Sequence, residues 1–309
     1  MMKAIMYHYV REYDPELPKF RFLDIQNFRK QLDYIEQTFG FVSRKDWDLV
    51  IQKKKLGSAE GKVVLTFDDS LSCHFDYVFP ELKKRNLWGI FYVPTQPYIR
   101  SKMLDVHRVH LLCGAFDGPL LLNTLYEFLE DDMISDSKIK NFRNKTYLKQ
   151  SNYEGISEFK QTLNYLVNYE FRENLIDNVA KSVGYEFNSA HFYLSKDELK
   201  EMYSYGNIIG AHTVTHPVMS RLGHSDQQIQ IKESFSFLED LVFQNHKTYC
   251  HPYGGFHSFN EDTIDILGTE QVMYSFSIES RDITKNDLEF SYQFLPRFDC
   301  NEFPYGKAS

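Results

Sequence analysis

Short apolar runs alternate with amphipathic segments along the first hundred residues of the chain. Three of the runs have the length and composition of buried strands: residues 3–7 ("KAIMY"), 62–67 ("KVVLTF") and 87–94 ("LWGIFYVP"). Between the first two runs, residues 25–38 place Phe28, Leu32 and Ile35 on one helical face, and Asp24 stands where an N-cap is expected. A strand–helix–strand order implies parallel strands, so the pattern predicts an α/β architecture.

The middle of the chain follows a different pattern. From about residue 105 to residue 193, helical segments are joined by polar loops, and one segment carries its apolar residues on a single stripe: Ile156, Phe159, Leu163 and Leu166. Strand-like runs return afterwards within "NIIGAH", "KTYCHPYGG", "QVMYSFSI" and "YQFLPRF". Because the sequence shows no internal repeat and no low-complexity linker, we predict one domain over residues 1–309, with a helical insertion at about 105–193.

Polar side chains stand at the ends of three predicted strands. Asp68 and Asp69 follow "VVLTF", His212 and His216 follow "IIGA", and His251 to Tyr253 follow "KTYC". Sites of parallel α/β folds gather at such strand ends, and H-x3-H spacing brings two imidazoles to one metal when the segment is tightly turned. A divalent cation held by the two histidines and one carboxylate would relieve the repulsion between the adjacent aspartates. The other carboxylate would remain available as a base.

Composition and charge limit the classes of partner. The 309 residues are 42% hydrophobic and carry a formal net charge of −8, which argues against a nucleic-acid groove or an anionic membrane surface. No segment approaches the roughly 18 apolar residues of a membrane span. The four cysteines lack C-x-x-C spacing, and the opening "MMKAIMYHYV" does not have the pattern of a signal peptide. Reduced thiols and a cytoplasmic location are therefore predicted, while the oligomeric state stays open.

Three stretches, in this order, resemble the motifs of one known family: "LTFDDS", "GAHTVTH" and "HPYGG". They are similar to those of the polysaccharide deacetylase family, the metal-dependent carbohydrate esterases of family four. The flanking stretches "ELKKRNLWGIFYVP" and "LSKDELKEMYSYGNIIGAH" also resemble that family. The resemblance covers most of residues 1–100 and 193–300, and it implies a distorted (β/α)7 barrel.

The resemblance also implies a role for each matching residue. Asp68 matches the general base of the family. Asp69, His212 and His216 match the ligands of a divalent metal, expected to be zinc, which acts as a Lewis acid on an amide carbonyl. Tyr253 matches the residue that lines the substrate groove and offers a backbone N–H to the oxyanion.

The chain departs from the family pattern at three places. Ser70 stands where the family usually has glycine, and Cys250 stands where it normally has arginine. The late Leu-x-His motif that supplies the general acid is missing, and the nearest C-terminal stretch reads "LPRF". One branch of the family places an early Tyr-His at the end of the first strand, which "MYHYV" resembles. His8 is therefore the expected acid, and Arg297 is the expected replacement for the missing arginine beside Asp68.

These residues predict a metal-dependent N-deacetylase that acts on an acetylated amino sugar in surface-glycan or sugar-precursor metabolism. Two alternatives remain: a deformylase or other small-amide hydrolase that uses the same site, and a catalytically degraded sugar-binding barrel. The helical insertion is expected to cap the C-terminal rim of the barrel and to restrict the substrate to small or linked sugars. His107 and His110 are expected to have surface or packing roles rather than to form a second metal site.

Overall fold

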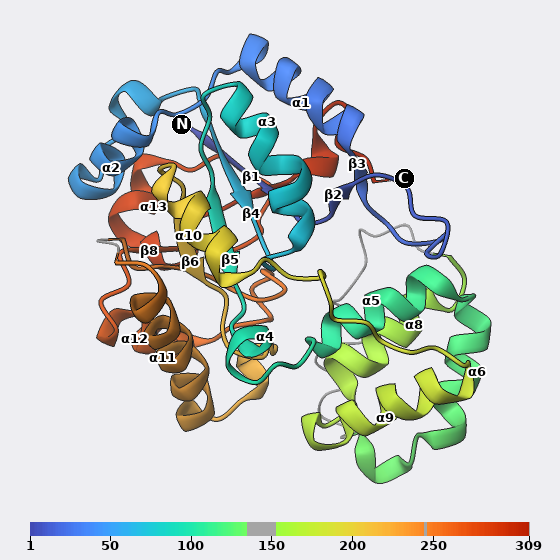
Figure 1. Ribbon diagram of the computed structural model, residues 1–309. Helices are drawn as coiled ribbons and strands as arrows, with labels where there is room; N and C mark the ends of the chain where they lie inside the picture. Colours follow the sequence, from blue (N-terminus) through green and yellow to red (C-terminus); the bar gives the residue numbers. More distant parts are fainter. Residues whose placement is uncertain (135–152, 244–245, 309) are drawn as a thin grey trace. The chain divides into compact units, whose positions relative to one another are not determined.

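The computed structural model describes residues 1–134, 153–243 and 246–308 and is shown in Figure 1. The described residues form two compact units. Unit 1 consists of Met1–Glu12, Phe22–Ser101 and Ala190–Ser309, and unit 2 consists of Tyr13–Arg21 and Lys102–Ser189. The segment predicted as a helical insertion thus supplies most of unit 2, and its residues 135–152 lie outside the described residues.

Unit 1, as described, is built on a seven-stranded sheet in which all neighbouring strands are parallel. In spatial order the strands are β8 (Tyr274–Phe276), β7 (Thr248–Cys250), β6 (Ile208–Ala211), β5 (Ile90–Val93), β4 (Val63–Phe67), β1 (Lys3–Tyr7) and β9 (Phe298–Asp299). Two short strands, β2 (Val10–Arg11) and β3 (Leu23–Asp24), pair in parallel as a separate sheet. The apolar runs from "KAIMY" to "QVMYSFSI" are thereby confirmed as strands.

The last part of the chain closes the sheet on itself. Leu295 forms a parallel bridge to β8, and shortly afterwards Phe298 pairs with Ile5 of β1. The strand expected near "YQFLPRF" begins only at Phe298, the last residue of that stretch, because Tyr292–Phe294 form a 3-10 turn. Pro296 has no N–H to donate to a strand ladder, which explains the delay. The curled parallel sheet of seven strands confirms the predicted (β/α)7 barrel class.

Helices connect the strands of unit 1, as Figure 1 shows. They are α1 (Ile25–Thr38), α2 (Arg44–Lys53), α3 (Phe79–Lys84), α4 (Gln96–Ile99), α10 (Lys196–Ser204), α11 (His224–Leu241), α12 (Glu261–Thr269) and α13 (Lys285–Phe290). Shorter turns are the π-helix His74–Val78 and the 3-10 turns Gly57–Ala59, Met219–Arg221, Tyr292–Phe294 and Cys300–Glu302. The predicted cap of α1 is confirmed, since the Asp24 carboxylate accepts the backbone N–H groups of Gln26 and Asn27.

The two faces of the sheet belong to separate cores, because successive side chains of a strand point to opposite faces. On one face, Ile5 and Leu65 pack with apolar residues of α1, α3, α10, α11 and α12. On the other face, Val64 and Tyr92 pack with residues of α2, β7 and β8. Asp68 follows Val64 by an even number of positions, so the strand period directs its side chain to the second face.

Unit 2, as described, is helical and has an apolar core of its own. Its elements are α5 (Asp105–Ala115), α6 (Gly118–Phe128), α8 (Ile156–Gln161), α9 (Tyr169–Ser182), the 3-10 turn Asp131–Met133 and the π-helix Thr162–Leu166. Arg172 and Arg108 both donate to the Asp105 carboxylate, at 2.9 and 3.3 Å. His107 is buried and His110 is half-buried on the same helix. No helix within the described residues is long and apolar enough to cross a bilayer.

Candidate active site

Three turns after β4, β6 and β7 share a strained backbone. Positive φ angles occur at Asp69 (81°) and Ser70 (54°) after β4, at Thr213 (66°) and His216 (53°) after β6, and at Tyr253 (62°) after β7. Non-glycine residues rarely adopt this conformation, and such strain concentrates at functional sites. Ser70 thus takes the left-handed conformation that a glycine at this position would favour.

The turns after β4 and β6 bring three possible metal ligands together. Oδ1 of Asp69 lies 3.6 Å from Nε2 of His212 and 3.7 Å from Nε2 of His216. The three side chains are buried, and their donor atoms lie within 4.8 Å of one another. Bonds of about 2.0–2.1 Å to a tetrahedral zinc ion place donor atoms roughly 3.4 Å apart. The spacing of the three residues therefore fits a single metal ion.

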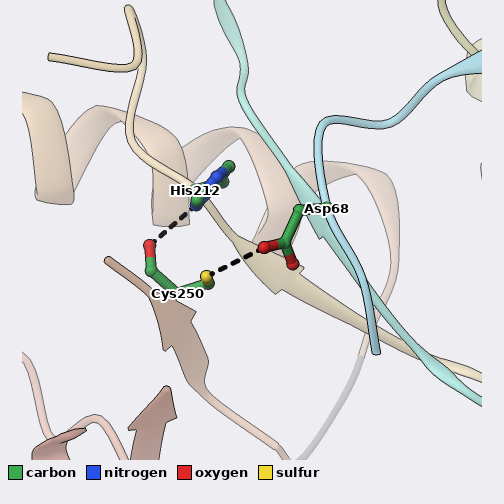
Figure 2. A group of neighbouring side chains, drawn as sticks. All are labelled: Asp68, His212 and Cys250. Carbon is green, nitrogen blue, oxygen red and sulfur yellow. Dashed lines mark hydrogen bonds between the residues drawn. The ribbon is translucent and has the colours of Figure 1, made fainter. Parts of the chain in front are cut away.

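A hydrogen bond determines which ring nitrogen of His212 faces this cluster. Nδ1 of His212 lies 2.8 Å from the backbone carbonyl oxygen of Cys250, as Figure 2 shows. A carbonyl can only accept, so Nδ1 carries the proton and Nε2 presents its lone pair toward Asp69. Burial lowers the pKa of His212, which keeps the ring neutral. A neutral imidazole oriented in this way has the protonation state that a metal ligand requires.

Asp68 is held by Arg297 in a bidentate ion pair. Nη1 of Arg297 donates to Oδ1 at 2.9 Å, and Nη2 donates to Oδ2 at 2.8 Å. Burial alone would raise the pKa of Asp68, but the charge and hydrogen bonds of Arg297, together with the nearby rings of His212 and His8, outweigh burial and lower the pKa to about 2. Asp68 is therefore ionised at neutral pH. Because both side chains are buried, removal of either partner would cost about 3–5 kcal/mol of stability.

Cys250 completes the surroundings of Asp68. Its thiol donates to Oδ2 of Asp68 at 3.5 Å, and Nη2 of Arg297 donates to the sulfur at 2.9 Å (Figure 2 shows the first of these contacts). Burial raises the pKa of the thiol well above its usual range, so the sulfur stays protonated. The side chain that stands in the place of the family's arginine is thus a neutral donor. The positive charge comes instead from the segment that precedes β9.

His8 follows β1 and lies beside both carboxylates. Its Nε2 is 4.0 Å from Oδ2 of Asp68 and 3.8 Å from Oδ2 of Asp69. These distances are too long for hydrogen bonds. The His8 side chain is 35% exposed, whereas those of Asp68 and Asp69 are 3% and 4% exposed. His8 is therefore the solvent-accessible titratable group next to the buried pair.

Tyr253 brings the third turn to the same place. Its ring centroid lies 4.9 Å from that of His216, and the backbone turn is closed by the Gly254 N–H, which donates to the His251 carbonyl at 3.1 Å. The structure thus gathers the residues that the sequence assigned to the site: His8, Asp68, Asp69, His212, His216, Tyr253 and Arg297. The catalytic roles of these residues stay predictions.

Two buried histidines near the site had no assigned role in the sequence analysis. Nε2 of His74 donates to the backbone carbonyl of His8 at 2.7 Å, and Nε2 of His251 donates to the carbonyl of Gln293 at 2.8 Å. Both stand next to a motif, but no periodicity encodes the direction of a side chain in a turn. One indication for His74 was present in the sequence. It begins the π-helix that follows β4, so it lies at the edge of the sheet where the strands end and the site forms.

These two histidines make the stability of the fold depend on pH. Burial lowers the pKa of His74 to about 4 and that of His251 to about 3, against about 6.5 in an unfolded chain. Between roughly pH 4 and 6.5 the unfolded chain therefore binds more protons than the folded chain. The free energy of unfolding should fall as the pH is lowered through this window, by up to about 1.4 kcal/mol per pH unit for each ring.

Urea unfolding of the parent and of His251→Gln, at about pH 7 and about pH 5, measures this effect. The variant should lose less stability than the parent between the two pH values, because one of the two buried rings is gone. A His224→Gln variant is the control, since His224 is exposed and its replacement removes no buried ring. Equal losses in the parent and in His251→Gln would contradict the prediction.

Comparison by sequence identifies one family. A model of the polysaccharide deacetylase family matches residues 159–273. This stretch contains "GAHTVTH" and "HPYGG", whereas "LTFDDS" lies before it. A search of curated proteins finds no matching sequence.

Comparison by structure finds the same fold in known deacetylases. Streptococcus pyogenes deacetylase PplD, solved in complex with acetate, is 16% identical with a TM-score of 0.59, over 96% of this chain and 91% of that chain. A de-N-acetylase from Aggregatibacter actinomycetemcomitans is 13% identical with a TM-score of 0.54, over 96% and 94%. The deacetylase domain of BpsB from Bordetella bronchiseptica is 13% identical with a TM-score of 0.52, over 96% and 95%. At these identities the likeness shows the fold.

The early Tyr-His branch stays a prediction, because none of these comparisons resolves it. By sequence over residues 159–273, and by fold over nearly the whole chain, the resemblance to the polysaccharide deacetylase family is confirmed.

Proposed function

We propose that this protein is a metal-dependent hydrolase that removes the N-acetyl group of an acetylated amino sugar. The observation that carries the proposal is the buried cluster of Asp69, His212 and His216 beside the ionised carboxylate of Asp68. A metal site with an adjacent carboxylate base is one arrangement that can hydrolyse an amide. The match to the deacetylase family and the shared fold support this assignment.

A divalent cation, expected to be zinc, would be held by Asp69, His212 and His216. When bound, it supplies a Lewis acid that polarises the amide carbonyl and makes a water molecule easier to deprotonate. Asp68 accepts the proton of the attacking water, and Arg297 fixes both of its oxygens while it does so.

The remaining groups act on the charges that develop during the reaction. The backbone N–H of Tyr253 donates to the oxyanion, a kind of contact that contributes about 3 kcal/mol to transition-state stabilisation. His8 protonates the departing nitrogen, because an unprotonated amine anion is too poor a leaving group. The products are the free amino sugar and acetate.

The substrate is proposed to be an acetylated amino sugar of a surface glycan or of its precursor. A cytoplasmic protein would meet a nucleotide- or lipid-linked sugar. Two of the similar structures are described as a deacetylase in complex with acetate and as a de-N-acetylase, which supports the N-acetyl group as the bond cleaved.

The metal assignment predicts about one zinc ion per chain in the purified protein. The variant His216→Ala should lose most of this metal, because it removes one of three buried protein ligands. Elemental analysis of the parent and the variant measures the change. His224→Ala is the matched control, since His224 is an exposed histidine at the start of α11 and should leave the metal content unchanged. Full retention of metal in His216→Ala would overturn the assignment.

The reaction itself is tested by measuring acetate release from N-acetylated nucleotide sugars and short N-acetylated glycans. Acetate and a free amine should appear in equal amounts. Formate released from N-formyl analogues, without acetate from acetylated sugars, would instead identify a deformylase. Sugar binding by the zinc-loaded protein without any hydrolysis would identify a degraded, sugar-binding barrel.

A further inference from the structure

The backbone around His8 is anchored at three successive carbonyl groups. The carbonyl of Tyr7 accepts from the N–H of Asp68 at 3.0 Å, where the pairing of β1 with β4 ends. The carbonyl of Tyr9 accepts from the backbone of β3 at 2.8 Å. Between these two, the carbonyl of His8 accepts from Nε2 of His74 at 2.7 Å. A side chain thus supplies the anchor at the residue whose ring lies beside the carboxylates.

The surroundings of His74 would suit an apolar residue equally well. The ring is fully buried, and its centroid lies 5.6 Å from that of Phe67 and 5.8 Å from that of Phe91. Its Nδ1 has no hydrogen-bond partner among the residues that the structure describes. Burial of a half-satisfied imidazole costs free energy that a leucine or phenylalanine would not cost. An apolar residue, however, could not donate a hydrogen bond to the His8 carbonyl.

The local backbone and the state of the ring agree with that role. His74 opens the π-helix His74–Val78, and π-helical turns occur frequently at functional sites. A carbonyl can only accept, so Nε2 of His74 must carry the proton. Burial lowers the pKa of His74 to about 4, so the ring is neutral near pH 7 and keeps this tautomer.

We propose that His74 is a positioning residue whose N–H fixes the main chain of His8, so that the His8 ring stays beside Asp68 and Asp69. This inference rests on the proposed function, in which His8 protonates the leaving amine. A misplacement of about 1 Å in a reacting group can lower a rate by roughly 10²-fold, so a single hydrogen bond to the backbone is sufficient to matter.

The test compares two substrates that differ in their need for an acid. An N-acetylated amino-sugar oligosaccharide needs protonation of its nitrogen, whereas p-nitrophenyl acetate releases a phenolate that leaves without it. In zinc-loaded His74→Leu, kcat for the amide should fall at least about tenfold more than kcat for the ester, with KM and metal content near those of the parent. His74→Gln should recover most of the loss, because its amide N–H can donate to the same carbonyl.

A matched control separates this effect from a loss of stability. Asn207 is buried just before β6, at the end of the sheet away from the candidate site. Its side chain accepts from the Gly89 N–H and donates to the Met202 carbonyl, at 2.8 Å each. Asn207→Leu should lower the thermal midpoint but leave the ratio of amide to ester activity unchanged. Equal losses on the two substrates in His74→Leu would show that His74 only supports the fold, and would overturn the inference.

Failure of the proposed function would give a different result. If His8→Ala leaves the amide-to-ester ratio unchanged, the acid role of His8 is wrong, whatever the His74 variants show.

Crystal structures of the parent and of His74→Leu test the position of the His8 ring without any activity measurement. The His8 ring should move away from its place 3.8 Å from Asp69. An unmoved ring would overturn the positioning role.

Discussion

Replacement of Asp68 by asparagine should lower the rate of deacetylation by roughly 10²- to 10⁴-fold, the usual contribution of a positioned general base. The amide keeps the shape of the side chain but cannot accept the proton of the attacking water. The zinc content should stay at the parental level, because the cluster of Asp69, His212 and His216 is intact. Single-turnover rates on an N-acetylated amino sugar, measured with the metal content of the same sample, test this expectation.

The change should also destabilise the protein, since Arg297 would keep its buried positive charge without a counter-charge. Rates must therefore be measured well below the lowered thermal midpoint. Asp282→Asn provides the isosteric control, because Asp282 pairs with Lys3 at the start of β1, 2.6 Å apart and at the other end of the sheet. A rate near that of the parent in Asp68→Asn would mean that another group takes the proton.

The variant His8→Ala should lose on the order of 10²-fold or more in turnover on amide substrates. The ring stands 3.8 Å from the Asp69 carboxylate and is partly exposed, so it can protonate a nitrogen that leaves beside Asp69. The metal content and the thermal midpoint should change little, since the ring makes no hydrogen bond with the carboxylates. Turnover on N-acetylated sugars gives the measurement.

Added imidazole provides an independent check on this role, because a free acid can enter the space that the missing ring leaves. It should restore part of the activity of His8→Ala and none of the activity of Asp68→Asn. His224→Ala, which removes an exposed histidine at the start of α11, should behave as the parent does. Unchanged turnover in His8→Ala would transfer the acid role to another residue.

The sheet and most of the candidate site could be predicted because the signals are local. A short apolar run such as "KVVLTF" in an α/β chain indicates a buried strand, and this strand ends directly before Asp68 and Asp69. Since parallel strands end at the same edge, the polar residues after each strand must lie together. The structure does bring Asp69, His212 and His216 together, with donor atoms within 4.8 Å of one another, although the turns between them were not predicted.

Other features could not be predicted because they depend on how distant turns meet. From the sequence, Cys250 stands where an arginine was expected, so this position lacks a positive charge beside Asp68. In the structure the Cys250 thiol contacts Asp68, and Arg297 from a different segment supplies the positive charge. The assignment of Arg297 needed the analogy to a family, since an "LPRF" stretch carries no such signal alone. Residues 13–21 joined unit 2 although they precede the first predicted helix, because a short irregular segment shows no periodicity to follow.

The segment Leu295–Asp299 closes the sheet, and it also has a consequence for the order in which the molecule forms. Arg297 meets its partner Asp68 across 229 positions of chain, and Phe298 pairs with Ile5 near the beginning. Contacts between such distant residues form slowly, because loop-closure entropy opposes them until the rest of the structure is in place. A chain that is still on the ribosome would have a free edge at β1 and an aspartate without its cation. The ion pair that holds Asp68 can therefore form only after the segment up to Arg297 has been synthesised.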